Sequence, residues 1–365
     1  MLRRFSAPLR FLVRLVCLVF ACHFLKAALI VRYMNQCADR EFSLQALAES
    51  EALREIVASM PQPFGVMMLN KHVVDMTLNW LCNTAHMPGV HERMLFFTLD
   101  DDAAQQLLDV YPYLKTFTWS TECLQSSFRP LDGTYMSFFL LRTNLIRTLS
   151  YLRHNFWMLQ ADTFWKENLF NNIEYNDSSL EINVALDQQG YSGISNTRKK
   201  QMNGANFLVF GKQPNTQDLF DDLHYYQTHF YVTDPDAMKV VCASKRYHCN
   251  FIDHSIVSGW EWIYGPQRNA PDLMQMDGET SGGKVRMLKQ YKLWFLDDDH
   301  QCIPGAVAAA KYLADNGMVP RLYSNSKVKQ KLLLAIGEFF ASLPLFGRVY
   351  RVYGGLPSLY LQVFS

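Results

Sequence analysis

The chain has 365 residues, of which 49% are hydrophobic and 19% are charged, and its formal net charge is +1. This length fits one large globular domain with appendages, or two small domains. The near-neutral charge, without a basic block or stripe, gives no reason to expect nucleic acid as a partner. Aromatic residues make up 14% of the chain, which suits a deep core and a pocket able to stack planar or sugar rings.

The N-terminal segment combines arginines with a long apolar run. Four arginines lie within residues 3–14, and residues 15–25 are almost entirely apolar. We expect a membrane-spanning helix over residues 11–31, with the N-terminus in the cytosol and the rest of the chain in a lumen. An uncleaved signal anchor is the preferred interpretation, and a cleaved signal peptide is the alternative. The expected segments are a cytosolic tail (1–10), a transmembrane signal anchor (11–31), a stem (32–60), a large catalytic-type domain (61–345) and a C-terminal tail (346–365).

The cysteines bear on the compartment. Two of the eight lie in the apolar segment and six lie beyond it, none in a paired CxxC arrangement, so a zinc site is not expected. In a lumen the six would form up to three disulfides, and Cys242 with Cys249 is the pair we expect first. The alternative is that most of them are small, buried apolar residues. Asn176-Asp177-Ser178 is a glycosylation sequon, which is meaningful only if this part of the chain is lumenal.

Short apolar runs alternate with helical patterns from residue 44 onwards. Strands are expected at 64–69, 94–99, 114–118, 156–159, 182–186, 207–210 and 293–296. Helices are expected at 44–60, 73–82, 103–111, 135–154, 214–229, 306–314 and 327–340, and another is expected to open near Asp253 and to include Trp262. Residues 266–287 are expected to form a loop. This alternation predicts βαβ units, that is, an α/β fold with a mostly parallel sheet flanked by helices.

The residues that follow the strand at 156–159 are the first candidate for a site. Ligands of open α/β sheets bind beyond the carboxyl ends of the strands, and Gln160 and Asp162 point the same way because strand side chains alternate. Asp162 suits Mg²⁺ or Mn²⁺ as a hard oxygen ligand, with Gln160 as a neutral hydrogen-bonding partner. The alternative is that Asp162 only caps the following turn. Its place after a long helix and a buried strand favours the metal ligand.

Other polar residues near strand ends are further candidates for the site. Arg142 either reaches a phosphate or is a solvated surface arginine. Asn203 and Asn206 flank Gly204, where the backbone can approach a ligand closely and the two amides offer donors and acceptors to hydroxyls. Asp253 is either an N-terminal cap or a pocket carboxylate.

Two acidic runs, Asp100 to Asp102 and Asp297 to Asp299, also follow predicted strands, the second with His300 directly after it. Metal binding is one interpretation of each run. We favour helix capping for the first run, because a helical pattern follows it immediately, and a solvated turn for the second.

Taken in order, several pieces of the chain resemble the nucleotide-diphospho-sugar transferase family of type II Golgi-membrane glycosyltransferases. The resemblance covers roughly residues 64–265. The pieces that carry it are Leu78-Asn79-Trp80-Leu81, Leu99-Asp100, the helix with Arg142 and Leu145-Ile146, the run from Phe156 to Trp165, Asn203-Gly-Ala-Asn206-Phe207, and Asp253. Within the run, Gln160 to Trp165 resembles the D-x-D-x-x-W motif of that family, with Gln160 in place of the first Asp.

The resemblance implies a GT-A fold, a nucleotide-sugar donor, a glycan or glycoprotein acceptor, and a divalent metal, Mn²⁺ or Mg²⁺, on the donor diphosphate. It implies transfer with retention of the anomeric configuration, and a single-pass protein of the Golgi membrane with a lumenal domain. Asp162 is then the metal ligand, Gln160, Arg142, Asn203 and Asn206 contact the donor, and Asp253 is the candidate catalytic carboxylate. The second hypothesis is a catalytically inactive lumenal binding or scaffolding protein of the same fold, which Gln160 supports.

Overall fold

The computed structural model describes residues 7–127, 132–172, 181–189, 201–259, 262–263, 267–276 and 283–320, with four isolated residues between 332 and 343. The sequon at Asn176 and the expected C-terminal tail at 346–365 lie outside the described residues. The helix expected at 327–340 lies largely outside them.

Within the described residues, the centre of the molecule is a seven-stranded sheet with the strand order β3-β2-β1-β4-β7-β6-β8. Its strands are β1 (Phe64–Leu69), β2 (Met94–Thr98), β3 (Lys115–Thr118), β4 (Asn155–Leu159), β6 (Val184–Gln189), β7 (Gln201–Phe210) and β8 (Cys249–Phe251). The strands β1 to β4 pair in parallel, β7 runs antiparallel to both of its neighbours, and β8 is parallel to β6. The prediction of a mostly parallel α/β sheet is therefore confirmed.

A second sheet of the described residues has three short strands in the order β5-β10-β9. They are β5 (Thr163–Trp165), β9 (Val257–Ser258) and β10 (Leu273–Gln275). Three residues separate the end of β4 from the start of β5, so the segment that joins the two sheets is Gln160-Ala161-Asp162. The candidate site thus lies where the chain passes from one sheet to the other.

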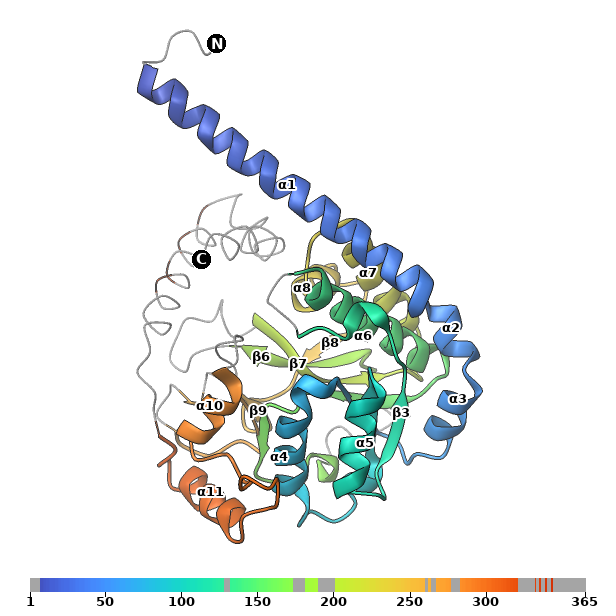
Figure 1. Cartoon of the computed structure of the whole chain (residues 1–365), viewed down its shortest axis with the longest axis vertical. Coiled ribbons are helices and arrows are strands. Elements are labelled where there is room, and N and C mark those ends of the chain that lie inside the picture. The colour runs from blue at the N-terminus through green and yellow to red at the C-terminus, as the bar shows by residue number, and fades with distance from the viewer. Residues whose placement is uncertain are drawn as a thin grey trace.

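Helices cover both faces of the large sheet, as Figure 1 shows. They are α1 (Ala7–Glu41), α2 (Leu44–Glu49), α3 (Glu51–Ala58), α4 (Val74–Thr84), α5 (Asp101–Val110), α6 (Gly133–Tyr151), α7 (Thr216–His229), α8 (Asp234–Ala243), α10 (Gly283–Gln290) and α11 (Ala306–Asp315). Successive side chains of β1 enter different cores, because strand side chains alternate. Val66 and Met68 pack with α6 and α7, whereas Met67 and Leu69 pack with α4.

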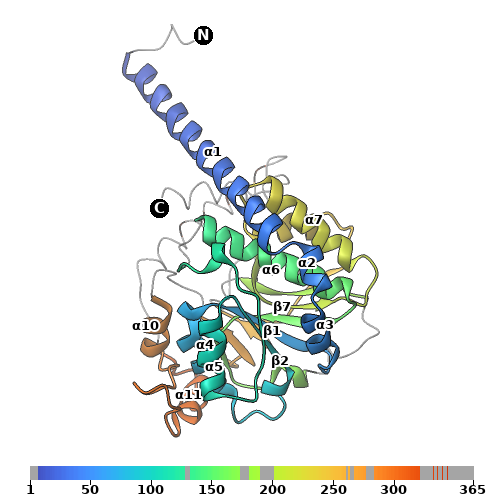
Figure 2. The same cartoon turned by 45° about the vertical axis from the view of Figure 1, so that its right-hand side comes forward.

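The expected stem is part of the folded body. Met34, Ala38 and Phe42 are buried in the core that contains α6 and α7, and Asn144 of α6 donates to the carbonyl of Phe42 at 3.1 Å. The N-terminal part of α1 instead extends away from the body, as Figure 2 shows. The segment from residue 34 onwards therefore stabilises the domain.

The expected membrane span at 11–31 falls within α1. No helix among the described residues combines the length and the apolar character needed to cross a membrane.

The six cysteines beyond the apolar segment form three disulfides, Cys37–Cys123, Cys82–Cys302 and Cys242–Cys249. The pairing of Cys242 with Cys249 was the one expected from the sequence, and it is confirmed. The alternative that most of these cysteines are only small apolar residues is wrong.

Several predicted elements need correction. The helix expected to open near Asp253 begins later: the Asp253 carbonyl accepts the amides of Ile256 and Val257 and closes a turn that leads into β9, whereas Trp262 and Ile263 are helical. The strand expected at 293–296 is also wrong, since only an isolated bridge from Leu296 to Cys302 forms there. The loop expected at 266–287 contains β10 and the start of α10. The helix expected at 44–60 is two helices, because Ser50 accepts the Leu53 amide as a new N-cap.

The two acidic runs follow the favoured interpretations. Asp100 caps α5, since its carboxylate accepts the amide of Ala103 at 2.7 Å. Asp297 holds an exposed turn by accepting the amides of Asp299 and Gln301 at 3.0 and 2.8 Å.

Candidate functional site

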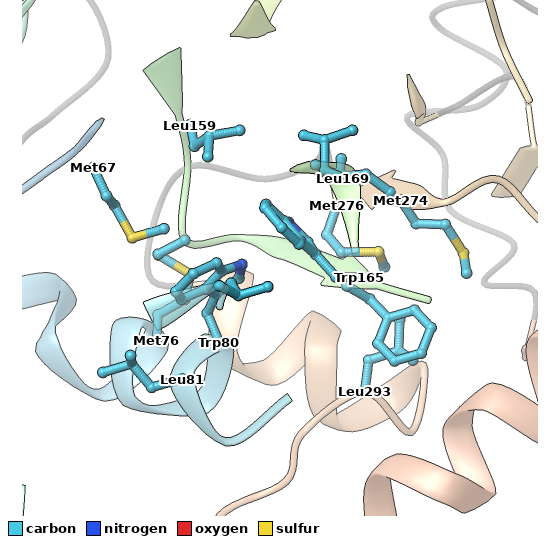
Figure 3. Packing of buried hydrophobic residues seen from close by; sticks show 14 of the residues in the cluster. Met67, Met76, Trp80, Leu81, Leu159, Trp165, Leu169, Met274, Met276 and Leu293 are labelled. Carbon is cyan, nitrogen blue, oxygen red and sulfur yellow. The ribbon is translucent and has the colours of Figure 1, made fainter. Parts of the chain in front are cut away.

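Gln160 and Asp162 follow the carboxyl end of β4, which lies between β1 and β7 in the sheet. The chain then turns into β5, and Trp165 at the end of β5 is buried against Trp80 of α4, with ring centroids 5.3 Å apart. Figure 3 shows the two indoles within the apolar cluster. The side chain of Asn83 fixes the end of β5, since it accepts a hydrogen bond from the Trp165 amide at 2.7 Å and donates one to the Trp165 carbonyl at 3.0 Å. Trp165 therefore packs beneath the turn and holds the Gln160–Asp162 segment in place.

Asp162 forms an ion pair with a residue far along the chain. Its side chain is 3% exposed, and its Oδ2 atom contacts Nζ of Lys284 in the first turn of α10. The Lys284 side chain is 26% exposed, so the lysine is the more accessible partner of the pair. The carbonyl of Asp162 accepts the amide of Met276 at 2.8 Å, which ties the turn to the end of β10. Asp162 is thus a buried, ion-paired carboxylate just beyond the carboxyl end of β4.

Three amide side chains join the strands that meet beside Asp162. Asn206 of β7 accepts the backbone amide of Gln160 at 3.1 Å and donates to Gln275 of β10 at 2.6 Å. Gln275 in turn donates to the Gln160 side chain at 3.3 Å. The structure therefore brings Gln160 and Asn206 together, whereas Asn203 lies half-buried near the start of β7.

A buried carboxylate shapes the segment of β7 that carries Asn206. Asp187 is 1% exposed and accepts the backbone amides of Gly204, Ala205 and Asn206 at 2.7, 3.1 and 2.7 Å. These three amides lie at an irregularity in the pairing of β6 with β7, where the partner strand offers them no carbonyl. Burial raises the pKa of Asp187 to about 6, although the hydrogen bonds from Asn206 and Gly204 oppose that rise. Asp187 thus positions Asn206 through the backbone.

Arg142 of α6 also contacts this segment of β7, through its carbonyls. Its side chain is 3% exposed, and Nη2 donates to the carbonyls of Gly204 and Ala205 at 2.8 and 3.3 Å. Nη1 lies 3.3 Å from Asp234 Oδ2, an ion pair without the alignment of a hydrogen bond, and burial raises the pKa of Asp234 to about 7. The interpretation of Arg142 as a solvated surface residue is wrong. Its guanidinium is committed to protein groups, so its predicted contact with a donor phosphate has no support in this geometry.

Gly204 is required at this position. Its φ is +72°, and a Cβ atom there would lie 2.7 Å from Cγ of Pro235. The close approach that the sequence suggested at Gly204 is therefore to α8 and not to a ligand.

Asp253 lies exposed in the turn between β8 and β9. Its Oδ1 accepts the amide of Ser255 at 2.8 Å, and this hydrogen bond lowers the pKa of Asp253. The geometry is that of a cap, although it caps a turn and not a helix. The catalytic role of Asp253 stays a prediction.

The described residues around Asp162 do not fit a divalent cation. Such a cation needs several oxygen ligands, with carboxylates foremost. In the described part of the site, the carboxylate of Asp162 is paired with an ammonium group and its neighbours are neutral amides. Among the described residues, the group of acidic, histidine or cysteine side chains close enough to share an ion is Cys37, Glu41 and Cys123. Both cysteines of that group are in one disulfide, which removes them as ligands.

A surface pocket lies elsewhere, at the amino end of β2. It is lined by Pro88, Gly89, Arg93, Asn168, Phe170 and Asn171. Because β2 runs parallel to the strands beside it, this pocket is at the opposite edge of the sheet from Gln160 and Asp162. We do not assign it to the site.

The sequence interpretation missed Asp187, Gln275 and Lys284. Asp187 directly follows the strand predicted at 182–186, and this is the same signal that singled out Asp162. Gln275 and Lys284 lie in the segment interpreted as a loop, where no periodicity marks them.

Comparisons with known proteins bear on this arrangement. The sequence profile of the nucleotide-diphospho-sugar transferase family matches residues 89–288, which is more than half of the chain. No curated protein sequence matches the chain. The matched residues include Gln160, Asp162, Asn206, Gln275 and Lys284.

Several solved structures are similar to this one at low identity. Mouse xyloside xylosyltransferase 1 in its apo form is 12% identical, with 60% of this chain and 98% of that chain covered and a TM-score of 0.43. The galactosyltransferase LgtC with donor and acceptor sugar analogues is 10% identical, with 73% and 99% covered and a TM-score of 0.42. The apo bifunctional glycosyltransferase WbbM is 8% identical with a TM-score of 0.41, and the match covers 60% of this chain but only 46% of the length of WbbM. The profile match over residues 89–288 shows that the chain belongs to the nucleotide-diphospho-sugar transferase family.

Proposed function

We propose that the protein is a glycosyltransferase that moves a sugar from a nucleotide-diphosphate-sugar donor to a glycan or glycoprotein acceptor, at the carboxyl end of β4. The observation that carries the proposal is the family match, which contains Gln160, Asp162 and every residue bonded to their side chains. The position of these residues supports it, because ligands of open α/β sheets bind beyond the carboxyl ends of the strands. The mixed sheet is compatible with the GT-A fold that the sequence resemblance implies.

The reaction breaks the bond between C1 of the sugar and the β-phosphate oxygen, which keeps the electron pair. It forms a bond from C1 to an acceptor hydroxyl, whose proton passes to a base. Negative charge develops on the departing diphosphate, so positive charge fixed beside it favours the transition state. The amides of Gln160 and Asn206 offer donors and acceptors that suit the hydroxyls of the donor. Asp253 is the candidate carboxylate for the acceptor side, and retention of the anomeric configuration is part of the proposal.

A non-catalytic binding or scaffolding protein of the same fold is the second candidate. The observation in its favour is Gln160, which replaces a carboxylate of the family motif with a neutral amide. Only the first candidate cleaves a nucleotide-sugar. Donor cleavage therefore separates them.

We further propose that the folded domain resides in the Golgi lumen, attached to the membrane through the N-terminal part of α1. The three disulfides support an oxidising compartment. The exposed apolar side chains of Phe11, Leu18 and Phe24 support contact with lipid. In sealed microsomes, the domain should resist added protease until detergent is present. Digestion without detergent would contradict this topology.

The test of the function uses the full chain in detergent and a panel of nucleotide-sugars, and it measures released nucleoside diphosphate. We expect one donor to be hydrolysed by the wild type, and Asp162→Ala to lose that activity. Asp101→Ala is the matched control, because Asp101 is an exposed carboxylate at the same edge of the sheet and should be dispensable. Turnover by Asp162→Ala at the wild-type rate would reject the proposal. Binding without hydrolysis of any donor would favour the second candidate.

A further inference from the structure

We infer that Lys284 supplies the positive charge that meets the donor diphosphate, so that the protein binds its nucleotide without a divalent metal. The inference rests on the proposed function and concerns the same site. It assigns a donor-binding role to a residue of α10 that the sequence pattern did not mark.

The geometry of the pair is the first support. Asp162 is almost fully buried, whereas Lys284 contacts its Oδ2 atom from a position that leaves 26% of the lysine side chain exposed. A ligand that approaches the carboxyl end of β4 from solvent can thus reach the lysine side chain, whereas the carboxylate is covered. The pair lies at the end of β4, in the place where the family motif holds its metal-binding carboxylates.

The charges around Asp162 are the second support. Among the residues that the structure describes here, one carboxylate and one ammonium group form a pair, and the three amides beside them are neutral and bonded to one another. A divalent cation on Asp162 would lie within a few ångströms of the ammonium group, where like charges repel strongly. Gln160 removes the second carboxylate that would offset this repulsion. Gln160 in place of a carboxylate and the ammonium group of Lys284 therefore both make the site less favourable for a divalent cation.

The chemistry of the lysine fits a diphosphate. An ammonium group is a compact charge with three hydrogen-bond donors, and lysine is a common phosphate-binding residue in proteins. Lys284 is the second residue of α10, so the first amides of that helix lie close to it. Such amides lack partners within the helix and favour anions. Asp162 would then orient the lysine, and Lys284 would contact the phosphate.

The test is isothermal titration of the full chain with UDP, GDP, CDP and ADP, first in EDTA and then in excess MnCl₂. We expect one of these nucleotides to bind in EDTA with a dissociation constant that Mn²⁺ leaves unchanged. Lys284→Gln keeps a hydrogen-bond donor but loses the charge, and it should weaken binding by about tenfold or more. The matched control is Lys289→Gln, because Lys289 is in the same helix but its ammonium group lies over the ring of Trp294.

The outcomes distinguish failure of the role of Lys284 from failure of the proposed transferase function. Binding only in the presence of Mn²⁺, or wild-type affinity in Lys284→Gln, overturns the role of Lys284 and leaves the transferase function standing. Failure of all four nucleotides in both conditions overturns the proposed function itself. A second measurement uses the wild type, so it does not require that a variant folds. The protein is titrated with MnCl₂ alone, and binding is followed by electron paramagnetic resonance. We expect no stoichiometric Mn²⁺ site, and such a site would overturn the inference.

Discussion

Replacement of Arg142 by methionine should destabilise the protein strongly. The change removes two hydrogen bonds to β7 carbonyls, at 2.8 and 3.3 Å, and the ion pair with Asp234. It also removes the contact of the guanidinium with the ring of Phe207, whose centroid is 4.8 Å away. All of these groups are buried, so water cannot replace the lost partners without reorganisation.

The size of the loss in unfolding free energy follows from the burial of these groups. Removing one partner of a buried ion pair costs about 3–5 kcal/mol, because the other charge is left uncompensated. Protonation of Asp234 limits the loss, since the pKa of this carboxyl is already raised to about 7 by burial. In urea, with a slope near 3 kcal/mol per molar for a domain of this size, the midpoint should fall by roughly 1–1.7 M.

Arg147 provides the control on the same helix. It pairs with Asp221 at 2.6 Å, but the Asp221 side chain is 42% exposed, so Arg147→Met should cost only about 0–1 kcal/mol. The measurement is urea unfolding followed by tryptophan fluorescence for both variants. Equal midpoints for Arg142→Met and Arg147→Met would refute the assignment of Arg142 as a buried structural residue.

The remaining predictions concern pH and the N-terminal segment. Burial raises the native pKa of Asp234 to about 7, from 3.8, so stability from this group is complete at low pH and is lost as pH rises through 7. Asp234→Asn should therefore flatten the fall in melting temperature between pH 5 and pH 8, and an unchanged pH profile would contradict this. A chain that begins at residue 31 should melt like the full chain, whereas one that begins at residue 43 should melt roughly 10 °C lower, because it lacks the Cys37–Cys123 disulfide and the buried Met34, Ala38 and Phe42. Equal melting temperatures for the two truncations would show that the end of α1 does not stabilise the domain.

The strands β1, β2 and β4 at the centre of the large sheet were predictable because each is a short, mostly apolar run. The bounds of β1 agree with the sequence prediction at both ends, and those of β2 and β4 agree within one residue. The Asp100 cap and the Cys242–Cys249 disulfide were also predictable, since each depends on residues close in sequence. Local patterns therefore determine most of the layers that position the site.

The second sheet and α10 were not predictable, for a physical reason. The strands β9 and β10 have two and three residues, too few for a periodicity, and they exist because β10 pairs with β9 on one side and with β5 on the other. The turn after Asp253 was mistaken for a helix start because the same capping residues serve both. Lys284 reaches Asp162 across 122 positions of sequence, so no local pattern could pair them.

Arg142 shows a different limit of prediction from sequence. Its helical spacing placed it away from the most apolar face of α6, which is typical of a solvated arginine, yet it is buried. The carbonyls of the β7 irregularity and the carboxylate of Asp234 together satisfy it, and both come from later parts of the chain. A buried charge of this kind becomes visible only once its partners are placed.

The location of the donor is the central claim, and a crystal structure with the nucleoside diphosphate selected by the donor panel tests it most directly. We expect the diphosphate beyond the carboxyl ends of β1 and β4, in contact with the Gln160–Asp162 segment and the first turn of α10. A nucleotide in the pocket formed by Gly89, Arg93 and Phe170, at the other edge of the sheet, would contradict the assignment.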